Sequence, residues 1–354
     1  MSNVPVDLNA TPHAATLQLT LLDAIRDELR AALRFGPTPA DEHELMLWYH
    51  MGWVDCGERP AVNGKAVRPL LTLLTSMATG GDWRQALPFA AAVELVHSFS
   101  LVHDDIQDRG RQRRGRPSVW AKWGESQAIN VGDSLFASAH AAALRESGLA
   151  PEARVRAVGT LIDACLALSR GQFLDLSFES RAEVEVEEYM AMVRGKTAAL
   201  LAAACELGGV ASGVSRSELR ALASFGEHLG VAFQIRDDLL GIWGDPRDTG
   251  KPATDIVDRK KTLPVLLGME RSAEVRALVE RSSPEEAALV AGLLRDVGAL
   301  NDSRAEMERN AMLALDALGG VAREGIAKDA LTGLVMKAVD VTSLSVNWQS
   351  AAAA

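Results

Sequence analysis

Apolar residues recur at intervals of three and four along most of the chain, which is the spacing of one helix face. The pattern is clear in LQLTLLDAIRDELRAAL (17–33), QALPFAAAVELVHSFSLVHDD (85–105) and SELRALASFGEHLGVAFQIRDD (217–238). Runs that alternate apolar and polar residues, which are typical of strands, are rare. The pattern therefore predicts an all-α fold.

Clusters of Gly, Pro and small polar residues separate the apolar segments and mark the expected helix ends. None of these clusters resembles a linker between domains. We therefore expect one large helical domain over residues 17–346, with a flexible N-terminal tail at 1–16 and a C-terminal tail at 347–354. The expected breaks between helices lie at 57–64, 79–83, 109–118, 146–152, 210–215, 243–252 and 281–286.

The composition, 48% apolar and 24% charged, is that of a globular chain that buries a core. A net charge of −10 argues against a general nucleic-acid binder, because an acidic surface repels polyanions. Cys56, Cys165 and Cys205 show no CxxC spacing, which fits small core residues in a reducing compartment. No stretch has the length of a membrane span or the pattern of a signal peptide, so we expect a cytoplasmic protein.

The segment LVHDDIQD (101–108) ends a long apolar run in a cluster of aspartates. Asp104 and Asp108 share one face of the predicted helix, and Asp105 lies at the edge of that face. Like charges at this spacing destabilise a helix unless a cation compensates them. Mg²⁺ is usually held by one or two carboxylates, retained waters and the phosphates of a substrate. The cluster therefore indicates Mg²⁺ and a phosphorylated substrate, although a solvated helix face or a set of ion pairs is the simpler alternative.

A second segment, IRDDLLG (235–241), repeats this arrangement 133 residues further along. Asp237 and Asp238 again end an apolar run, and Gln234 lies about one turn earlier. If the two segments face each other, their carboxylates form a polynuclear Mg²⁺ site at the mouth of an apolar region. Such a site suits an amphiphilic substrate with an anionic head and an apolar tail.

Basic residues follow both aspartate segments, as the binding of phosphates requires. A nucleic-acid patch is the alternative for the arginine-rich stretch, but it lacks interleaved aromatic residues. A solvated loop is the alternative for the lysines. The residues are Arg109, Arg111, Arg113, Arg114 and Arg116 after the first segment, and Lys251, Lys260 and Lys261 after the second.

Six collinear segments resemble the trans-isoprenyl diphosphate synthases, the polyprenyl synthetase family. The resemblance implies a helical bundle around a central apolar cavity, a homodimer, and the condensation of isopentenyl diphosphate with an allylic diphosphate. The segments are NGKAVRPLL (63–71), ELVHSFSLVHDDIQDRGRQRRGRPS (94–118), GD (132–133), GQFLDL (171–176), GKT (195–197) and QIRDDLLGIWGDPRDTGKPATDIVDRKKTLP (234–264).

The same resemblance implies roles for individual residues. Three Mg²⁺ ions are expected on Asp104, Asp108 and Asp237, and the expected catalytic set adds Asp105, Asp238 and Lys196. Isopentenyl diphosphate is expected at Lys65, Arg68, His97 and Arg114. The allylic diphosphate is expected at Arg113, Lys196, Thr197, Gln234, Lys251 and Lys260. The chain departs from the family pattern at Asn63, which replaces a glycine, and at Gly241, which replaces a third aspartate.

Product length in this family depends on the residues just before the first aspartate motif. Phe99 lies five residues before Asp104 and Ser100 four before it, with no insertion between the aspartates. This arrangement resembles the archaeal type that makes geranylgeranyl (C20) diphosphate. Helix geometry places Ser100 on the Asp104 face and Phe99 about 100° away, and so leaves open which residue closes the cavity.

Other functions remain as alternatives at this point. A farnesyl or longer-chain synthase would use the same residues with a different cavity floor. A terpene cyclase on the same scaffold would not need Lys65, Arg68, His97 and Arg114. A noncatalytic partner subunit would not need two intact aspartate clusters.

Overall fold

The computed structural model describes residues 12–33, 39, 41–54, 66–145, 147–245, 254–281 and 283–342. Helices dominate these residues, and the only strands among them form one two-stranded hairpin, so the predicted all-α class is confirmed. The elements of the first half are α1 Pro12–Ala32, α2 Glu42–His50, α3 Val67–Ala78, α4 Leu87–Gln107, β1 Gln112–Arg113, β2 Arg116–Pro117, α5 Val119–Trp123, α6 Glu125–Leu144 and α7 Pro151–Ser180.

The second half of the chain is also helical, and its helices pack against those of the first half. The elements are α8 Val186–Val193, the π-helical turn η1 Arg194–Ala198, α9 Ala199–Ser212, α10 Arg216–Trp243, α12 Leu263–Arg271, α13 Ala273–Arg281, the 3₁₀ turn η2 Pro284–Glu286, α14 Ala287–Asp296, α15 Ala299–Gly319 and α16 Ile326–Ala338.

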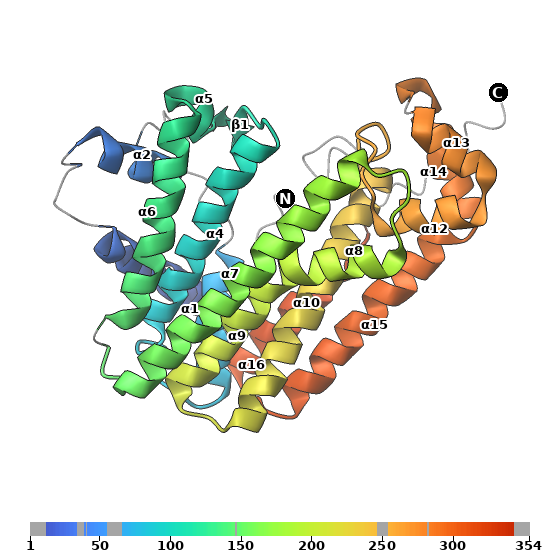
Figure 1. Cartoon of the computed structure of the whole chain (residues 1–354). Coiled ribbons are helices and arrows are strands. Elements are labelled where there is room, and N and C mark those ends of the chain that lie inside the picture. Colours follow the sequence, from blue (N-terminus) through green and yellow to red (C-terminus); the bar gives the residue numbers. More distant parts are fainter. Residues whose placement is uncertain are drawn as a thin grey trace.

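Four long helices, α4, α7, α9 and α10, run side by side through the middle of the molecule, with α6 and α15 on the two flanks (Figure 1). The three segments with the clearest helical periodicity match α1, α4 and α10 to within two residues at the ends that extend beyond these helices. Their apolar faces join one continuous core, because an amphipathic helix must bury its apolar stripe against another element. Helix α1 begins at Pro12, inside the expected N-terminal tail.

Several helix boundaries lie outside the expected breaks: those at Gly124, Ser272, 297–298 and 320–325, and the one between α7 and α8. The sequence predicted no break between residues 152 and 210, but α7 ends at Ser180 and α8 begins at Val186. No Gly or Pro marks this turn. The new helix starts with a capping box between Glu185 and Glu188, and Arg181 donates two hydrogen bonds to the Glu188 carboxylate.

Cys165 and Cys205 are buried free thiols, as expected for small core residues, and Cys56 lies outside the described residues. Within the described part of the chain, no helix is both long enough and apolar enough to cross a membrane.

Candidate active site

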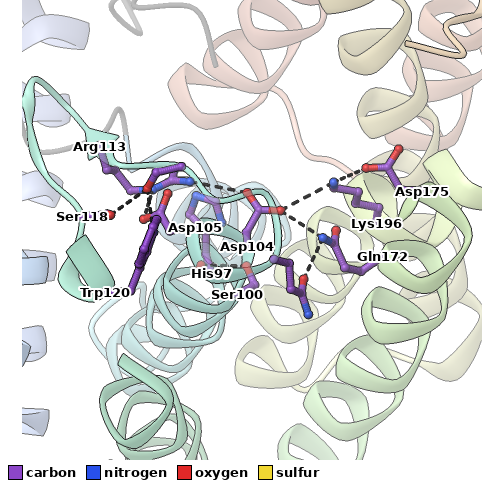
Figure 2. A network of polar contacts seen from close by, with 12 residues as sticks. His97, Ser100, Asp104, Asp105, Arg113, Ser118, Trp120, Gln172, Asp175 and Lys196 are labelled. Carbon is purple, nitrogen blue, oxygen red and sulfur yellow. Dashed lines mark hydrogen bonds and ion pairs between the residues drawn. The ribbon is translucent and has the colours of Figure 1, made fainter. Parts of the chain in front are cut away.

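The first aspartate cluster lies at the C-terminal end of α4, where the arginine-rich segment folds back over it (Figure 2). Asp105 is 4% exposed and accepts a hydrogen bond from Nε of Arg113 at 2.8 Å. Arg113 also reaches Asp104, with 3.4 Å between Nη2 and Oδ2. Burial raises the pKa of Asp105, and the bond from Arg113 opposes this rise. Asp105 is therefore a buried anchor for Arg113, whereas Asp104 is half-buried and faces the neighbouring helices.

The turn between β1 and β2 fixes the positions of the arginines in this hairpin. Arg114 and Gly115 form the two central residues between β1 and β2, and both have a positive φ, 53° and 74°. Asn-Gly is the usual sequence for such a turn, and a non-glycine residue pays a conformational cost there. Ser118 and Trp120 both donate to the Gly110 carbonyl and close the base of the loop. An arginine held at a strained position indicates a role for its side chain.

Lys196 approaches Asp104 from the opposite side, on the π-helical turn η1. Its Nζ lies 3.6 Å from Oδ1 of Asp104 and forms an ion pair with Asp175 of α7 (Figure 2). This reach depends on close backbone contact between α7 and η1. A Cβ at Gly171 would lie 2.2 Å from the Lys196 backbone nitrogen, so only glycine fits there. Burial lowers the pKa of Lys196, but Asp175 and Asp104 outweigh it and raise the pKa overall.

Two residues of the GQFLDL segment join the site in roles that the sequence analysis did not assign. Gln172 donates to Oδ1 of Asp104 at 3.2 Å, and Asp175, three residues later on the same face of α7, pairs with Lys196. Asp108 has a pKa raised to about 6, chiefly by burial and next by the charge of Asp104, while Lys196 opposes the shift. Negative charge around Asp108 therefore exceeds what Lys196 compensates.

The second aspartate cluster divides into a buried and a less buried residue. Asp238 is 4% exposed and accepts hydrogen bonds from the Tyr189 hydroxyl at 2.5 Å, Gln234 at 3.0 Å and the Leu263 backbone at 3.2 Å. Burial raises its pKa to about 7, against the effect of these bonds. Asp237, the predicted metal ligand, is half-buried. Protein donors thus surround Asp238, which we expected to act with Asp237. Their hydrogen bonds hold α8, α10 and α12 together.

The turn η1 connects the two clusters. Lys196 contacts Asp104, and the next residue, Thr197, donates to Gln234 of α10 at 2.8 Å. Gln234 in turn donates to Asp238. Residues from α4, η1 and α10, far apart in the sequence, therefore meet, as the facing-cluster hypothesis requires.

Lys260, which was expected at the allylic diphosphate, forms an ion pair with Asp255 at 2.7 Å. A Cβ at Gly241 would lie 1.9 Å from the Asp255 carboxylate. The space next to Gly241, where the family pattern has a third aspartate, is therefore occupied by a carboxylate from a later part of the chain. Lys65, Lys251 and Asn63 lie outside the described residues.

A second group of polar residues comes from α3, from α4 before Asp104 and from the turn between β1 and β2. We call it the basic cluster: Arg68, Glu94, His97 and Arg114. Nη1 of Arg68 lies 3.4 Å from Nε2 of His97. Burial, followed by the charges of Arg68 and Arg114, holds the pKa of His97 well below its ordinary value, so the ring is neutral. Burial raises the pKa of Glu94, and Arg114 and Arg68 oppose this. The cluster thus has two guanidinium groups and one carboxylate, and this excess of positive charge suits it to an anion.

The two residues expected to set product length make different contacts. The ring of Phe99 packs edge-to-face on Phe136 of α6, with 5.2 Å between ring centroids, and contacts His103. Ser100 donates its hydroxyl to the His97 carbonyl. Phe99 is half-buried and not part of the fully buried core.

The carboxylates fit Mg²⁺ held jointly with a substrate. Among the described residues, no three His, Cys, Asp or Glu side chains converge closely enough to hold a metal ion by themselves. Mg²⁺ takes oxygen ligands and usually completes its shell with waters and substrate phosphates. Asp104 and Asp108 supply hard oxygen donors without a complete cage.

Known proteins share both the sequence and this fold. Residues 58–296 match the polyprenyl synthetase family. A (2E,6E)-farnesyl diphosphate synthase of Mycobacterium tuberculosis is 43% identical over 322 residues, which cover 87% of this chain and 88% of that protein. A geranylgeranyl diphosphate synthase of the same organism is 45% identical over 234 residues, 65% of this chain and 66% of that protein. A polyprenyl synthetase structure from Streptomyces coelicolor has a TM-score of 0.83 at 38% identity and covers 92% of this chain and 100% of that chain.

Proposed function

Because the chain belongs to the polyprenyl synthetase family and is a trans-isoprenyl diphosphate synthase, we propose that it makes geranylgeranyl diphosphate in a Mg²⁺-dependent reaction. The observation that carries the proposal is the meeting of the aspartate clusters across Lys196 and Thr197. In this arrangement a diphosphate can contact metal-binding carboxylates and cations together.

The reaction joins the five-carbon isopentenyl diphosphate to an allylic diphosphate, head to tail. The C–O bond of the allylic diphosphate breaks, and the double bond of isopentenyl diphosphate attacks the allylic cation to form a C–C bond. The carbocation that results loses a proton to the released diphosphate, which forms the new double bond. Asp104, Asp108 and Asp237 would hold Mg²⁺, which when bound would supply Lewis-acid stabilisation of the leaving group. Arg113 and Lys196 take up the charge that develops on that group.

The basic cluster is the expected site of the second substrate. Arg68, Arg114 and His97 hold the diphosphate of isopentenyl diphosphate, and the charge of Glu94 offsets part of the positive charge of the two guanidinium groups. The neutral His97 accepts from Arg68 and so orients that guanidinium. The apolar residues along α4 keep water from the cation, since water would end the reaction as an alcohol.

Phe99 supports the C20 product. Its ring is braced against Phe136, so two aromatic residues from α4 and α6 together can stop a growing chain. Ser100 is small and leaves its side of α4 open to the tail. A farnesyl (C15) product is the second candidate, because a farnesyl diphosphate synthase shares 43% identity over 87% of this chain.

We also propose a homodimer. Large apolar side chains are exposed along α7, where Val155, Ile162, Leu166 and Phe173 recur at helical spacing. Leu166 is 67% and Phe173 69% exposed, and a second copy that packed the same face against this one would bury both. Light scattering at low micromolar concentration is expected to give twice the chain mass of 37.8 kDa, and the mass of one chain would refute the dimer.

Two substitutions test the product length. Phe99→Ala removes the ring that closes the cavity, so products longer than C20 are expected. Ser100→Phe introduces a ring one turn before Asp104 and is expected to stop growth near C15. If Phe99 is ordinary core, the alanine variant instead loses about 3–5 kcal/mol of stability with an unchanged product. Unchanged products from both variants would remove the basis for the C20 assignment.

A further inference from the structure

Asp255 is a buried acidic residue that lies against α10 and that the reaction described above does not use. The residue is 8% exposed, and its backbone N–H donates to the Gly241 carbonyl at 3.3 Å. Its two carboxylate oxygens lie 1.9 Å and 3.1 Å from the position where a residue other than glycine would carry Cβ at 241. These distances bracket the separation between Cβ and the carboxylate oxygens within an aspartate side chain. The Asp255 carboxylate therefore occupies the place that the carboxylate of an aspartate at position 241 would fill.

Position 241 shares a helix face with Asp237, because both lie in α10 and are four residues apart. Residues at this spacing have about 5–6 Å between their Cβ atoms. The Oδ2 atom of Asp255 lies 1.9 Å from the Cβ position of residue 241 and thus within about 8 Å of the Asp237 Cβ. The segment IRDDLLG contains two aspartates, but the fold brings a third carboxylate to the Asp237 face.

The turn formed by residues 254–260 holds Asp255 and Lys260 together. The Lys260 backbone N–H donates to the Asp255 carbonyl at 2.9 Å, and Arg259 has a φ of 55°, in the left-handed region. The Lys260 ammonium pairs with Oδ1 of Asp255 at 2.7 Å. Oδ2, the oxygen nearest the Cβ position of residue 241, accepts no hydrogen bond from a residue that the structure describes. Lys260 therefore fixes one carboxylate oxygen, and the other faces α10.

The Oδ2 atom of Asp255 suits a cation on the Asp237 side of α10. A buried carboxylate whose oxygens are not all paired costs free energy unless a cation or a further donor compensates it. Mg²⁺ takes oxygen ligands and keeps several waters, and carboxylates beside the direct ligands support such an ion through hydrogen bonds. An Asp255 carboxylate at this position meets both requirements.

We propose that Asp255 takes the role of the third aspartate that is absent at Gly241, and helps Asp237 to bind Mg²⁺. This inference rests on the proposed function, which places Mg²⁺ at Asp237. It gives a role to a residue for which the sequence analysis assigned none, and it explains how the chain keeps three carboxylates on this side of the site.

Binding of Mn²⁺, used as the probe for Mg²⁺, tests the proposal without turnover. Electron paramagnetic resonance measures free Mn²⁺ while the protein is titrated with Mn²⁺ in the presence of one equivalent of inorganic pyrophosphate, and pyrophosphate alone is the reference. Asp255→Asn keeps the size of the side chain and removes its charge. The variant is expected to raise the dissociation constant of one Mn²⁺ ion about 10-fold or more, as expected for a residue that supports a metal ligand. The ion affected is expected to be the one that Asp237→Ala removes.

Asp258→Asn is the matched control on the same turn. Asp258 is exposed, and its carboxylate accepts from the Thr254 hydroxyl at 2.8 Å. This variant loses the same charge and is expected to leave every Mn²⁺ dissociation constant at the wild-type value, because solvent and salt screen an exposed charge. The double variant Gly241→Asp/Asp255→Ala moves the carboxylate onto α10. It is expected to restore the Mn²⁺ affinity that Asp255→Ala alone loses.

Three outcomes would overturn the proposal. The first is equal Mn²⁺ affinity of the wild type and Asp255→Asn, and the second is the same loss of affinity in Asp258→Asn. The third is a higher KM for the allylic diphosphate in Asp255→Asn with unchanged Mn²⁺ binding, because Asp255 then only holds Lys260 in place. If Asp255→Asn does not fold, as judged by circular dichroism, Gly241→Asp/Asp255→Ala decides, and loss of the Mn²⁺ ion from that variant would overturn the proposal.

These measurements separate this inference from the proposed function. A wild type that forms no C20 product would refute the proposed function, and the Mn²⁺ comparison would still decide the role of Asp255. A wild type that forms the C20 product, together with an Asp255→Asn variant of equal Mn²⁺ affinity, would refute the role of Asp255 alone.

Discussion

Replacing Asp238 by asparagine removes a buried carboxyl whose pKa lies far above its ordinary value. Burial raises that pKa from 3.8 to about 7, although three donors contact the carboxylate. An acid with a raised pKa binds its proton more tightly in the folded chain than in the unfolded chain. Its contribution to stability is therefore present at low pH and is lost as the pH rises from about 4 through about 7.

The size of this loss follows from the shift. Each pKa unit corresponds to about 1.4 kcal/mol, so ionisation of Asp238 between pH 5 and pH 8 costs the fold about 2–3 kcal/mol. Asparagine does not titrate. We therefore expect the unfolding free energy of Asp238→Asn, relative to the wild type, to rise by about 2–3 kcal/mol from pH 5 to pH 8.

Urea denaturation of both proteins at the two pH values, followed by circular dichroism, measures this difference. Asp316→Asn, on the exposed side of α15, controls for the loss of one negative charge. Groups that titrate in both proteins cancel in the comparison. Unfolding free energies of the wild type and Asp238→Asn that run parallel between pH 5 and pH 8 would refute the burial argument.

Three further predictions concern the metal site and the network behind it. Asp104→Ala and Asp237→Ala are each expected to lower turnover by orders of magnitude with the fold intact by circular dichroism, and near-normal turnover would contradict their assignment as metal ligands. Chelation with EDTA is expected to abolish activity, and added Mg²⁺ to restore it; activity that survives chelation would count against the metal. Tyr189→Phe removes a donor to the Asp238 carboxylate and is expected to lower the unfolding free energy at pH 8 by about 1.5–3 kcal/mol.

The sequence predicted the helices and the first aspartate face because both depend on local spacing. Periodic apolar residues identified α4 and α10, and the 3.6-residue turn separated Asp104 and Asp108 from Asp105. The structure agrees, since Asp105 is buried against Arg113 while Asp104 contacts Gln172 and Lys196. Local spacing thus predicted the different orientations of these aspartate side chains.

The surroundings of Asp238 and Asp255 could not be predicted in this way. The donors to Asp238 include Tyr189 and Leu263, which come from elements 49 and 25 residues away. The position of the Asp255 carboxylate depends on how the turn formed by residues 254–260 packs against α10. Helical spacing does not predict such contacts, because they arise only when separate elements pack together.

The product of the unmodified protein tests the central claim most directly. Purified protein is incubated with labelled isopentenyl diphosphate, Mg²⁺ and, in turn, each allylic diphosphate of five, ten and fifteen carbons, and the products are sized after dephosphorylation. We predict that geranylgeranyl diphosphate (C20) is the final product from every primer. Growth that ends at C15, with no use of the fifteen-carbon primer, would contradict the account.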